Sequence, residues 1–528
     1  MPFGCHRYAC LPSIPKNDLT ILCRNPLWAF LTKRIAMNSH NRIGINSVNT
    51  AIASQKLFLT AASIVFTLLL IACPTIASAY EFSFSAYGPN RVVTGHNLYV
   101  EEVSAVTDIT GITDGSGRAY ILYFVDGLPA GATASWPLIQ ASCCGTNRGW
   151  GPANTLLQIN VPSTVPVGTY NLTLRVQSGG VTHQIPYTMA VDAVPGPLPK
   201  QVISSIPPIP ALSTWQTNMT SIGKTLCNSA SIISQGTWNG NIWFYDGIRV
   251  YYQIADYTGD SSWNACAGYV ESVYKPYVLN TPGVPGYYVF PHGLYQAYLR
   301  NNNDTDAKTA AIDLATQSAF SGKGGGVNDT TDDTPLRETA FLVSAYRIAG
   351  YLGSPNPTLY ARAVDYLLGA FDQEFVSQTN SFHKPFMTGL AMEALIQYYM
   401  DSNDPRVPPA IKAAVDWLWA NATMPDPLDP TGKSTTFYYE NTDSPLSPSP
   451  DLNLLIAPAY AWLYKITGNP IYQQEGDALF QDGVTYACAS CDGKHFSQNY
   501  RWSFDYVNWR SHPDITPPSP PMSLRVIQ

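Results

Sequence analysis

A carboxylate-rich loop that leads directly into a patterned helix holds the residue types best suited to chemistry. Over 328–351 the sequence reads NDTTDDTPLRETAFLVSAYRIAGY. Thr334 can cap the helix, Pro335 suits its first position, and a carboxylate such as Glu338 is favoured in the first turn by the unpaired N–H groups and the dipole. Because Asp333 directly precedes this turn, two carboxyl groups are expected at the helix start, where they could exchange protons with a bound substrate.

Apolar residues recur at helical spacing throughout the chain after Ala211. The expected helices cover roughly 211–231, 243–257, 262–276, 288–301, 305–320, 335–352, 357–376, 385–402, 407–421, 451–466, 470–484 and 499–510. Even-numbered segments, such as 385–402, are apolar nearly all round, whereas odd-numbered ones, such as 407–421, keep a polar stripe. An apolar surface all round indicates burial between neighbours, so the even helices are expected to form an inner ring and the odd helices an outer ring.

A repeated motif supports this arrangement. The pattern Tyr-x-Ile-Ala-x-Tyr-x-Gly occurs over 252–259 and again over 346–353, an offset of 94 residues that corresponds to two helical hairpins. Six helical hairpins with alternating burial resemble the (α/α)6 toroid of six-hairpin glycosidases and polysaccharide lyases. The resemblance covers about 211–510 and rests on architecture. It therefore implies a fold and a range of activities, and transfers no catalytic residue.

The connections at the two ends of the predicted toroid differ in length. Those that follow inner helices are short, whereas those that precede them are long and rich in glycine, aspartate and aromatic residues. Long irregular loops on a rigid scaffold are where sites are usually built, so the site is expected at the rim that receives the N-termini of the inner helices. The predicted catalytic residues are Glu338, Asp333, Glu440 and Asp246, and the predicted substrate-binding residues are Trp243, Tyr245, His292, Arg337, His383, Lys384, Tyr439, Tyr500 and Trp502.

These residue types match the requirements of glycoside hydrolysis. That reaction needs a protonated carboxylic acid for the leaving oxygen, a carboxylate that activates water or attacks, and flat apolar surfaces for sugar rings. Glu338 is the expected general acid, although a helix N-terminus and Arg337 both favour its ionised form. If these effects outweigh burial, the roles reverse, with Glu338 as the ionised base and Glu440 or Asp246 as the acid. The expected partner is a polysaccharide or oligosaccharide substrate.

Two other functions would use the same residues differently. A polysaccharide lyase needs a group that neutralises a uronate carboxylate and a base for the neighbouring proton, with His292, His383, Lys384 and Arg337 as candidates. Acidic rim residues outnumber basic ones, which disfavours a polyuronate. A non-catalytic glycan-binding envelope protein would depend on the aromatic residues and not on the carboxylates. Each residue taken singly could also serve a helix end or a loop, so the prediction depends on the whole set.

The segment before the toroid predicts a β-sandwich. Between 170 and 177 apolar and polar residues alternate, as in a half-buried strand, and further short runs such as 97–103 and 120–125 favour antiparallel sheets. The sequences GLPAG at 127–131 and PVGTYNL at 166–172 resemble the immunoglobulin-like domains of bacterial surface proteins. The predicted fold is therefore a multidomain chain, an immunoglobulin-like β-sandwich followed by an all-α (α/α)6 toroid. The expected boundaries are 1–79 for a leader and signal peptide, 80–194 for the sandwich, 195–210 for a Pro-rich linker, 211–510 for the toroid and 511–528 for a Pro-rich tail.

The N-terminal region predicts export. An apolar run over 57–72 is followed by Ala77-Ser78-Ala79, the small-x-small form of a signal-peptidase site. The mature chain is then expected to begin near Tyr80 and to be secreted or periplasmic. Two alternatives stay open, lipidation of Cys73 after a lipobox-like stretch and an uncleaved anchor. Membrane contact is expected only through this segment or that lipid.

The number of cysteines and the net charge of the chain limit the disulfides and the binding partners that can be expected. Six cysteines follow the leader, and in an exported protein an even number favours disulfides over free thiols. The expected pairs are Cys227 with Cys266, on consecutive outer helices, and Cys488 with Cys491, in one rim loop; Cys143 and Cys144 are left open. The net charge of −7 with only 13% charged residues gives no basic surface for nucleic acid. No metal site and no cofactor are predicted.

Overall fold

A computed structural model of the chain describes residues 82–106, 119–137, 148–151, 153–178, 181–301, 304–324 and 336–513. The chain forms two compact units, 1–78 and 79–528, and every described residue belongs to the second. The expected leader, its cleavage site and Cys73 lie outside the described residues, as do Asp333, Cys143 and Cys144. Within the described ranges, no helix has both the length and the apolar character required to cross a membrane.

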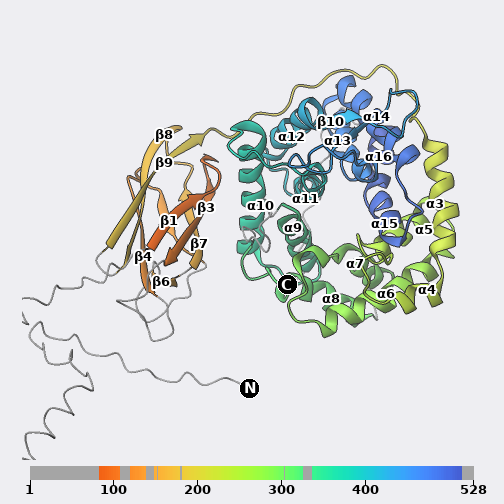
Figure 1. The fold of residues 1–528 in the computed structure, drawn as a ribbon, viewed down its shortest axis with the longest axis horizontal. Coiled ribbons are helices and arrows are strands. Elements are labelled where there is room, and N and C mark those ends of the chain that lie inside the picture. Colours follow the sequence, from red (N-terminus) through yellow and green to blue (C-terminus); the bar gives the residue numbers. More distant parts are fainter. Residues whose placement is uncertain are drawn as a thin grey trace, which may run out of the picture. The chain divides into compact units, whose positions relative to one another are not determined.

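Two β-sheets occupy the part of this unit that precedes residue 193 (Figure 1). The strands are β1 (Phe82–Tyr87), β2 (Arg91–Val93), β3 (His96–Val106), β4 (Ala119–Asp126), β5 (Thr133–Ser135), β6 (Arg148–Gly151), β7 (Ala153–Val161), β8 (Gly168–Ser178) and β9 (Val181–Asp192). One sheet has the order β1-β3-β7-β5 and the other the order β2-β9-β8-β4-β6. Neighbouring strands in these sheets are antiparallel except β2 and β9, which are parallel.

The two sheets share one hydrophobic core. Leu157 on β7 belongs to the same buried cluster as Leu174 and Val176 on β8, so each sheet contributes one inner face. Leu172, Leu174 and Val176 are buried at every second position of β8, as the alternating sequence predicts. The assignment of these sheets to the immunoglobulin-like class, and the predicted domain boundaries, stay predictions.

The helices after residue 211 form an (α/α)6 toroid, which Figure 1 shows as a closed ring. The inner helices are α5 (Gly247–Thr258), α7 (Pro291–Arg300), α9 (Leu336–Tyr351), α11 (Pro385–Ser402), α13 (Ala457–Thr467) and α16 (Ser503–Ser511). Each inner helix contacts the next one in this order, and the additional helix α15 (Gly493–Tyr500) closes the ring by contacting both α16 and α5. Residues 336–346 of α9 and 385–397 of α11 are buried almost without interruption, as the sequence predicts for inner helices.

Outer helices cover this ring. They are α3 (Leu212–Leu226), α6 (Trp263–Asn280), α8 (Thr305–Thr316), α10 (Pro357–Phe371), α12 (Val407–Ala422) and α14 (Pro470–Tyr486). Each contacts at least one inner helix that adjoins it in the sequence. The prediction of alternating inner and outer helices is therefore confirmed for the described residues. The preceding segment, 195–209, contains neither helix nor strand, and its Gln201 N donates to Thr467 O at the end of α13 at 2.6 Å.

Several predicted helix boundaries were wrong for local reasons. The first predicted helix is divided because Asn228 caps a separate helix, α4 (Ser229–Gln235), by accepting from Ser231 N. The predicted loop before the last helix contains α15, which Asp492 caps by accepting from His495 N. The other departures are the π-helix η3 (Asp372–Val376) at the end of α10, the 3-10 helices η2 (Gly286–Tyr288) and η4 (Pro450–Leu455), and a hairpin of β10 (Thr423–Pro425) and β11 (Thr435–Phe437) in the rim.

The repeated motif marks the same place in alternate inner helices. Gly259, the last residue of the first copy, follows α5 with φ 71°. Gly468, which follows Tyr464-Lys465-Ile466-Thr467 in a fainter version of the motif, ends α13 with φ 69°. This left-handed conformation closes a helix and favours glycine. Gly353 follows α9 with φ 88°. The motif therefore supplies the short turn that directs the chain from an inner helix to an outer one.

Both predicted toroid disulfides are present, Cys227–Cys266 with a sequence separation of 39 and Cys488–Cys491 with a separation of 3.

Because a longer closed loop restricts the unfolded chain more, we expect the double variant Cys227→Ser, Cys266→Ser to lose roughly 2–4 kcal/mol of unfolding free energy. The variant Cys488→Ser, Cys491→Ser should lose distinctly less. Urea denaturation of both variants measures the difference, and equal losses would contradict the loop-length argument.

Candidate active site

Two consecutive residues with strained backbone precede the inner helix α5. Tyr245 has φ 61° and Asp246 has φ 68°, the left-handed region that non-glycine residues rarely occupy. Such conformations cost of the order of 1–3 kcal/mol each and concentrate at functional sites. Asp246 caps α5 by accepting from Arg249 N at 3.4 Å, and both of its carboxylate oxygens accept from Gly293 N at 3.1 Å. One carboxyl group thus joins the N-termini of α5 and α7.

The close approach of these helices requires glycine at 293. A Cβ atom there would lie 2.4 Å from Asp246 Oδ1 and 2.5 Å from Ile248 Cβ. The Asp246 side chain is consequently enclosed, with the residue only 1% exposed. Burial raises the pKa of Asp246 to about 6, against the opposing effects of the Arg249 and Arg501 guanidinium groups. Asp246 is therefore a carboxyl group that can hold or release a proton near neutral pH.

A buried ionic triad lies at the same level of the ring. Glu393 on α11 pairs with Arg249 on α5, Oε1 to Nη1 at 2.5 Å, and with Arg501 after α15, Oε2 to Nη2 at 2.9 Å. Burial by itself would raise the pKa of Glu393, but Arg501 and Arg249 lower it to about 2. Glu393 is therefore ionised at any physiological pH, and the triad links helices from three parts of the sequence.

His292 on α7 extends this network. Its Nε2 lies 2.8 Å from Gln397 Oε1, while Gln397 Nε2 donates to Glu393 Oε1 at 3.2 Å. Because the Gln397 oxygen also accepts from Arg347 at 3.3 Å, it must be an acceptor for His292 Nε2–H. Burial and the charge of Arg249 hold the pKa of His292 well below its usual value, so the ring is neutral. Its unprotonated Nδ1 is 4.0 Å from Asp246 Oδ2.

The first turn of α9 places a second carboxyl group at the rim. Glu338 Oε1 accepts from Arg337 Nε at 2.9 Å, and both side chains are partly exposed. A Cβ atom on Gly286 of the neighbouring rim loop would lie 2.9 Å from Glu338 Cγ. The Arg337 guanidinium lies 5.5 Å from the centre of the Tyr287 ring. The predicted pair of Arg337 and Glu338 therefore faces the loop that precedes α7.

A third group comes from the start of α11 and the loop before η4. Lys384 Nζ pairs with Glu440 Oε2 at 2.7 Å and lies 5.9 Å from the centre of the Tyr439 ring. Tyr439 stacks on Phe386 at 5.4 Å and is 40% exposed. The exposed ring next to a lysine and a carboxylate gives this part of the rim a flat surface and both charges.

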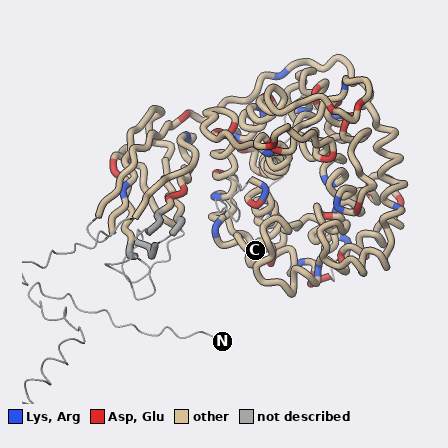
Figure 2. The backbone as a smooth tube through the Cα atoms, viewed as in Figure 1, with Lys and Arg blue, Asp and Glu red and all other residues tan. Residues whose placement is uncertain are grey.

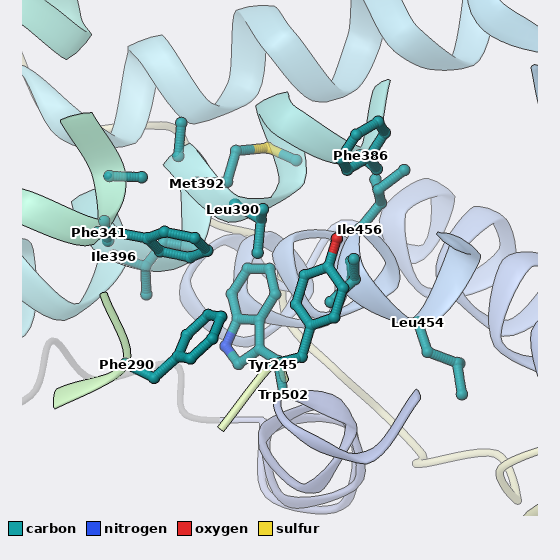
Figure 3. Packing of buried hydrophobic residues seen from close by; sticks show 14 of the residues in the cluster. Tyr245, Phe290, Phe341, Phe386, Leu390, Met392, Ile396, Leu454, Ile456 and Trp502 are labelled. Atoms are coloured by element: carbon teal, nitrogen blue, oxygen red, sulfur yellow. The ribbon is translucent and has the colours of Figure 1, made fainter. Parts of the chain in front are cut away.

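Tyr245 connects the rim with the buried network. Its ring centre lies 6.3 Å from that of Phe290, and the Phe290 centre lies 5.3 Å from that of Phe341. Figure 3 shows these rings in one cluster with Trp502. Burial raises the pKa of Tyr245 to about 12, while Arg337 and Arg501 lower it. The charges of one rim residue, Arg337, and one triad residue, Arg501, therefore both influence the Tyr245 hydroxyl.

Several predicted site residues lie elsewhere. Trp243 is 1% exposed and stacks on Tyr274 with 5.5 Å between ring centres, so it packs between helices and offers no surface to a sugar. Tyr500 is equally buried, and its hydroxyl donates to Trp215 O at 3.0 Å. Trp502 is fully buried in the toroid interior (Figure 3). These three residues are corrected from substrate platforms to core residues.

The side chain of His383 points away from the other rim residues. Its ring packs on Trp417 of α12 with 4.1 Å between centres, and its Nδ1 lies 3.8 Å from Glu374 Oε2. The next residue, Lys384, pairs with Glu440 instead. Asp333 lies outside the described residues. Glu338 and Arg337 lie in the first turn of α9, Tyr245 and Asp246 directly before α5, His292 in the first turn of α7, and Lys384, paired with Glu440, directly before α11.

The residues of the triad were not among the predicted site residues, which were all assigned to the rim. Arg249 and Glu393 stand inside segments that are otherwise almost entirely apolar, GIRVYYQIA and FMTGLAMEALIQ. A charged residue in a helix that is apolar all round must find a partner when the helix is buried. This signal was present in the sequence, although it names no partner. Arg501 carried no comparable signal, because it falls between two helices.

Charge and metal-binding groups are sparse over the toroid. Figure 2 shows Lys, Arg, Asp and Glu interspersed along the helical ring, without a region of one sign. Among the described residues, no group of three or more His, Cys, Asp or Glu side chains is arranged to hold a metal ion. The polar groups described for this site are carboxyl groups, guanidinium groups, a neutral imidazole and a tyrosine hydroxyl.

Comparisons with known proteins give loose structural likenesses. No protein-family model matches the chain, and no curated protein matches it. An unsaturated glucuronyl hydrolase specific for heparin is similar at a TM-score of 0.41 and 10% identity, over 57% of this chain and 99% of that chain. A polysaccharide lyase is similar at a TM-score of 0.34 and 10% identity, over 80% of this chain and 65% of that chain. An α2-macroglobulin fragment from Escherichia coli is similar at a TM-score of 0.26 and 10% identity, over 82% and 66% of the two chains.

The triad allows a stability prediction. Glu393→Gln removes the charge between Arg249 and Arg501, leaving two buried cations, so we expect a loss of roughly 3–5 kcal/mol in unfolding free energy. The control Asp256→Asn breaks the exposed pair with Arg300 and should cost less than about 1 kcal/mol. Urea denaturation at neutral pH compares them.

Lowering the pH should reduce the unfolding free energy through the same carboxyl group, that of Glu393. Because the pKa of Glu393 is lower in the folded chain than its usual value of 4.5, its contribution is complete above that value and is lost as pH falls toward 2. The stability difference between the native protein and Glu393→Gln should shrink over this range. A difference that stays constant down to pH 2 would contradict the ionic role.

Proposed function

We propose that this chain is a glycoside hydrolase that cleaves a polysaccharide or oligosaccharide with Asp246 as general acid and Glu338 as general base. The observation that carries the proposal is the contrast between these two carboxyl groups. Asp246 is buried with its pKa raised to about 6, whereas Glu338 is partly exposed and paired with Arg337. Two titratable groups in opposed environments are the usual mark of an acid and a base in one site.

These roles reverse the first expectation for Glu338. Its pairing with Arg337 suits a carboxylate that works ionised, as a base that activates water. Asp246 follows Tyr245 in the chain, and the charge of Glu338 helps to raise the pKa of the Tyr245 hydroxyl, for which burial is the main cause. Catalytic contacts of this kind often tighten only when substrate binds.

The cationic groups favour a substrate that carries a carboxylate, such as a uronate sugar. Arg501 Nε and Nη1 are buried and make no hydrogen bond to any described residue, although Nη2 pairs with Glu393. An unsatisfied buried guanidinium is costly, and a planar carboxylate is the group that it binds best. Arg337 at the rim provides a second cation near Tyr245.

The same cations support a second candidate, a polysaccharide lyase. In that reaction a guanidinium would neutralise the uronate carboxylate, and a tyrosine or histidine would take the neighbouring proton. Tyr245 lies near Arg337 and Arg501, and His292 is neutral with an unprotonated Nδ1. The two candidates differ in what they release, so one assay separates them.

We also propose that the chain is secreted or periplasmic. Two disulfides in the toroid fit an oxidising compartment, where such bonds form and persist. The small-x-small site before Tyr80 would then release the mature chain, or a lipid on Cys73 would anchor it.

The test of activity is a panel of neutral and uronate-containing polysaccharides. Reducing ends released without new ultraviolet absorbance indicate hydrolysis, whereas release accompanied by the absorbance of unsaturated uronates indicates elimination. Release from none of the panel would leave the non-catalytic glycan-binding function as the better account.

Variants test the carboxyl pair on whichever substrate is found. Glu338→Gln and Asp246→Asn should each lower kcat by at least about a hundredfold, the lower end of acid–base contributions. Asp256→Asn, in an exposed ion pair away from the rim, is the matched control and should retain full activity. Glu338→Gln with normal stability and near-normal kcat would sink the assignment.

The pH profile tests which group is the acid. Because Asp246 must be protonated to donate and its pKa is about 6, we expect kcat/KM to fall as pH rises through about 6. This decline should be absent from the residual activity of Asp246→Asn. An unchanged decline in that variant would assign the acid to another residue.

A further inference from the structure

An open cavity lies beside the rim, on the side of His383 rather than of Lys384. It has a volume of about 410 Å³ and lies between the loop after η3, the end of α12 and the loop before η4. Its lining includes Asn380, His383, Trp417, Asn421, Tyr438 and Asn441. None of these residues belongs to the carboxyl pair or to the triad, and the proposed hydrolysis uses none of them.

The walls of this cavity are fixed by hydrogen bonds. Asn441 Oδ1 accepts from His383 N at 2.9 Å, and Asn441 Nδ2 donates to Ser381 O at 2.5 Å, so one amide joins the two rim loops. Asn380 Oδ1 accepts from Phe382 N at 3.1 Å, and Asn421 Nδ2 donates to Trp417 O at 2.9 Å. Asn380 and Asn421 thus each use one end of the amide on the backbone, and the opposite ends are suited to a ligand.

The lining of this cavity contains no Lys, Arg, Asp or Glu. Behind His383 lies Glu374 on the π-helix, 1% exposed, with both carboxyl oxygens buried and without a hydrogen bond to any described residue. Burial raises the pKa of Glu374, which favours its neutral form. A π-helical turn at such a place is itself frequent at functional sites. The cavity therefore suits an uncharged ligand with several hydroxyl groups.

We propose that this cavity binds a neutral sugar residue of the substrate glycan, with Asn380 and Asn421 hydrogen-bonding hydroxyl groups and the half-buried Trp417 supplying apolar surface. Amides and aromatic rings are the pair of groups that fix a pyranose, whose faces are apolar and whose edges carry hydroxyls. The inference rests on the proposed glycan substrate. It places a subsite for an uncharged sugar next to a charged site. His383 lines the first, and the next residue, Lys384, belongs to the second through its pair with Glu440.

Binding of simple sugars tests the cavity without any need for turnover. The probes are glucose, galactose and N-acetylglucosamine, with glucuronate as the charged comparison, measured by saturation-transfer NMR titration on the full chain. Asn380→Ala and Asn421→Ala should each weaken the neutral probes about fivefold, since one hydrogen bond contributes roughly 1 kcal/mol. Asn280→Ala is the matched control, because Asn280 makes the same bond to the backbone four residues earlier, Pro276 O, outside the cavity.

The outcomes separate this inference from the proposed activity. Neutral probes that bind the native chain and Glu338→Gln alike, and more weakly the two cavity variants, support it. Absence of neutral binding, equal binding by the cavity variants with unchanged melting temperatures, or preference for glucuronate would each overturn it. If no polysaccharide is cleaved while the cavity variants lose sugar binding, the hydrolase proposal fails and the binding cavity stands.

Discussion

The carboxylate of Glu393, held between the guanidinium groups of Arg249 and Arg501, is the interaction on which the rest of the toroid depends. Removing three charges from water is costly, and only close pairing offsets that cost. The geometry of this pairing fixes α5, α11 and the segment after α15 relative to one another at the centre of the ring. The rim side chains on these elements are therefore held at fixed positions relative to one another.

The N-terminus of α5 is placed by the same requirement for close contact. Asp246 can reach Gly293 N only because position 293 has no side chain, and because two successive residues accept a left-handed backbone. The packing of Tyr245 against its neighbours offsets the energetic cost of that strain. The result is an enclosed carboxyl group 4.0 Å from the Nδ1 atom of a neutral histidine, His292.

The rim separates charged from uncharged chemistry over a single peptide step. Lys384 has an extended backbone, with φ −121° and ψ 96°, and successive side chains of an extended segment point to opposite sides. Lys384 consequently meets Glu440, while His383 packs on Trp417. Substrate charge would be sensed on one side of this step, and neutral hydroxyl groups on the other. In both places the side chains come from loops, while the helices behind them supply the fixed positions.

The sequence by itself determined the features that depend on local spacing: alternating inner and outer helices, the glycine turns such as Gly259, and the disulfide between Cys227 and Cys266 on consecutive outer helices. Only the tertiary structure decided which rim side chains meet. Trp243 and Glu338 both precede or begin inner helices, yet one packs inward against Tyr274 and the other stays beside Arg337. The direction of a loop side chain depends on contacts with residues distant in sequence, and periodicity carries no information about those contacts.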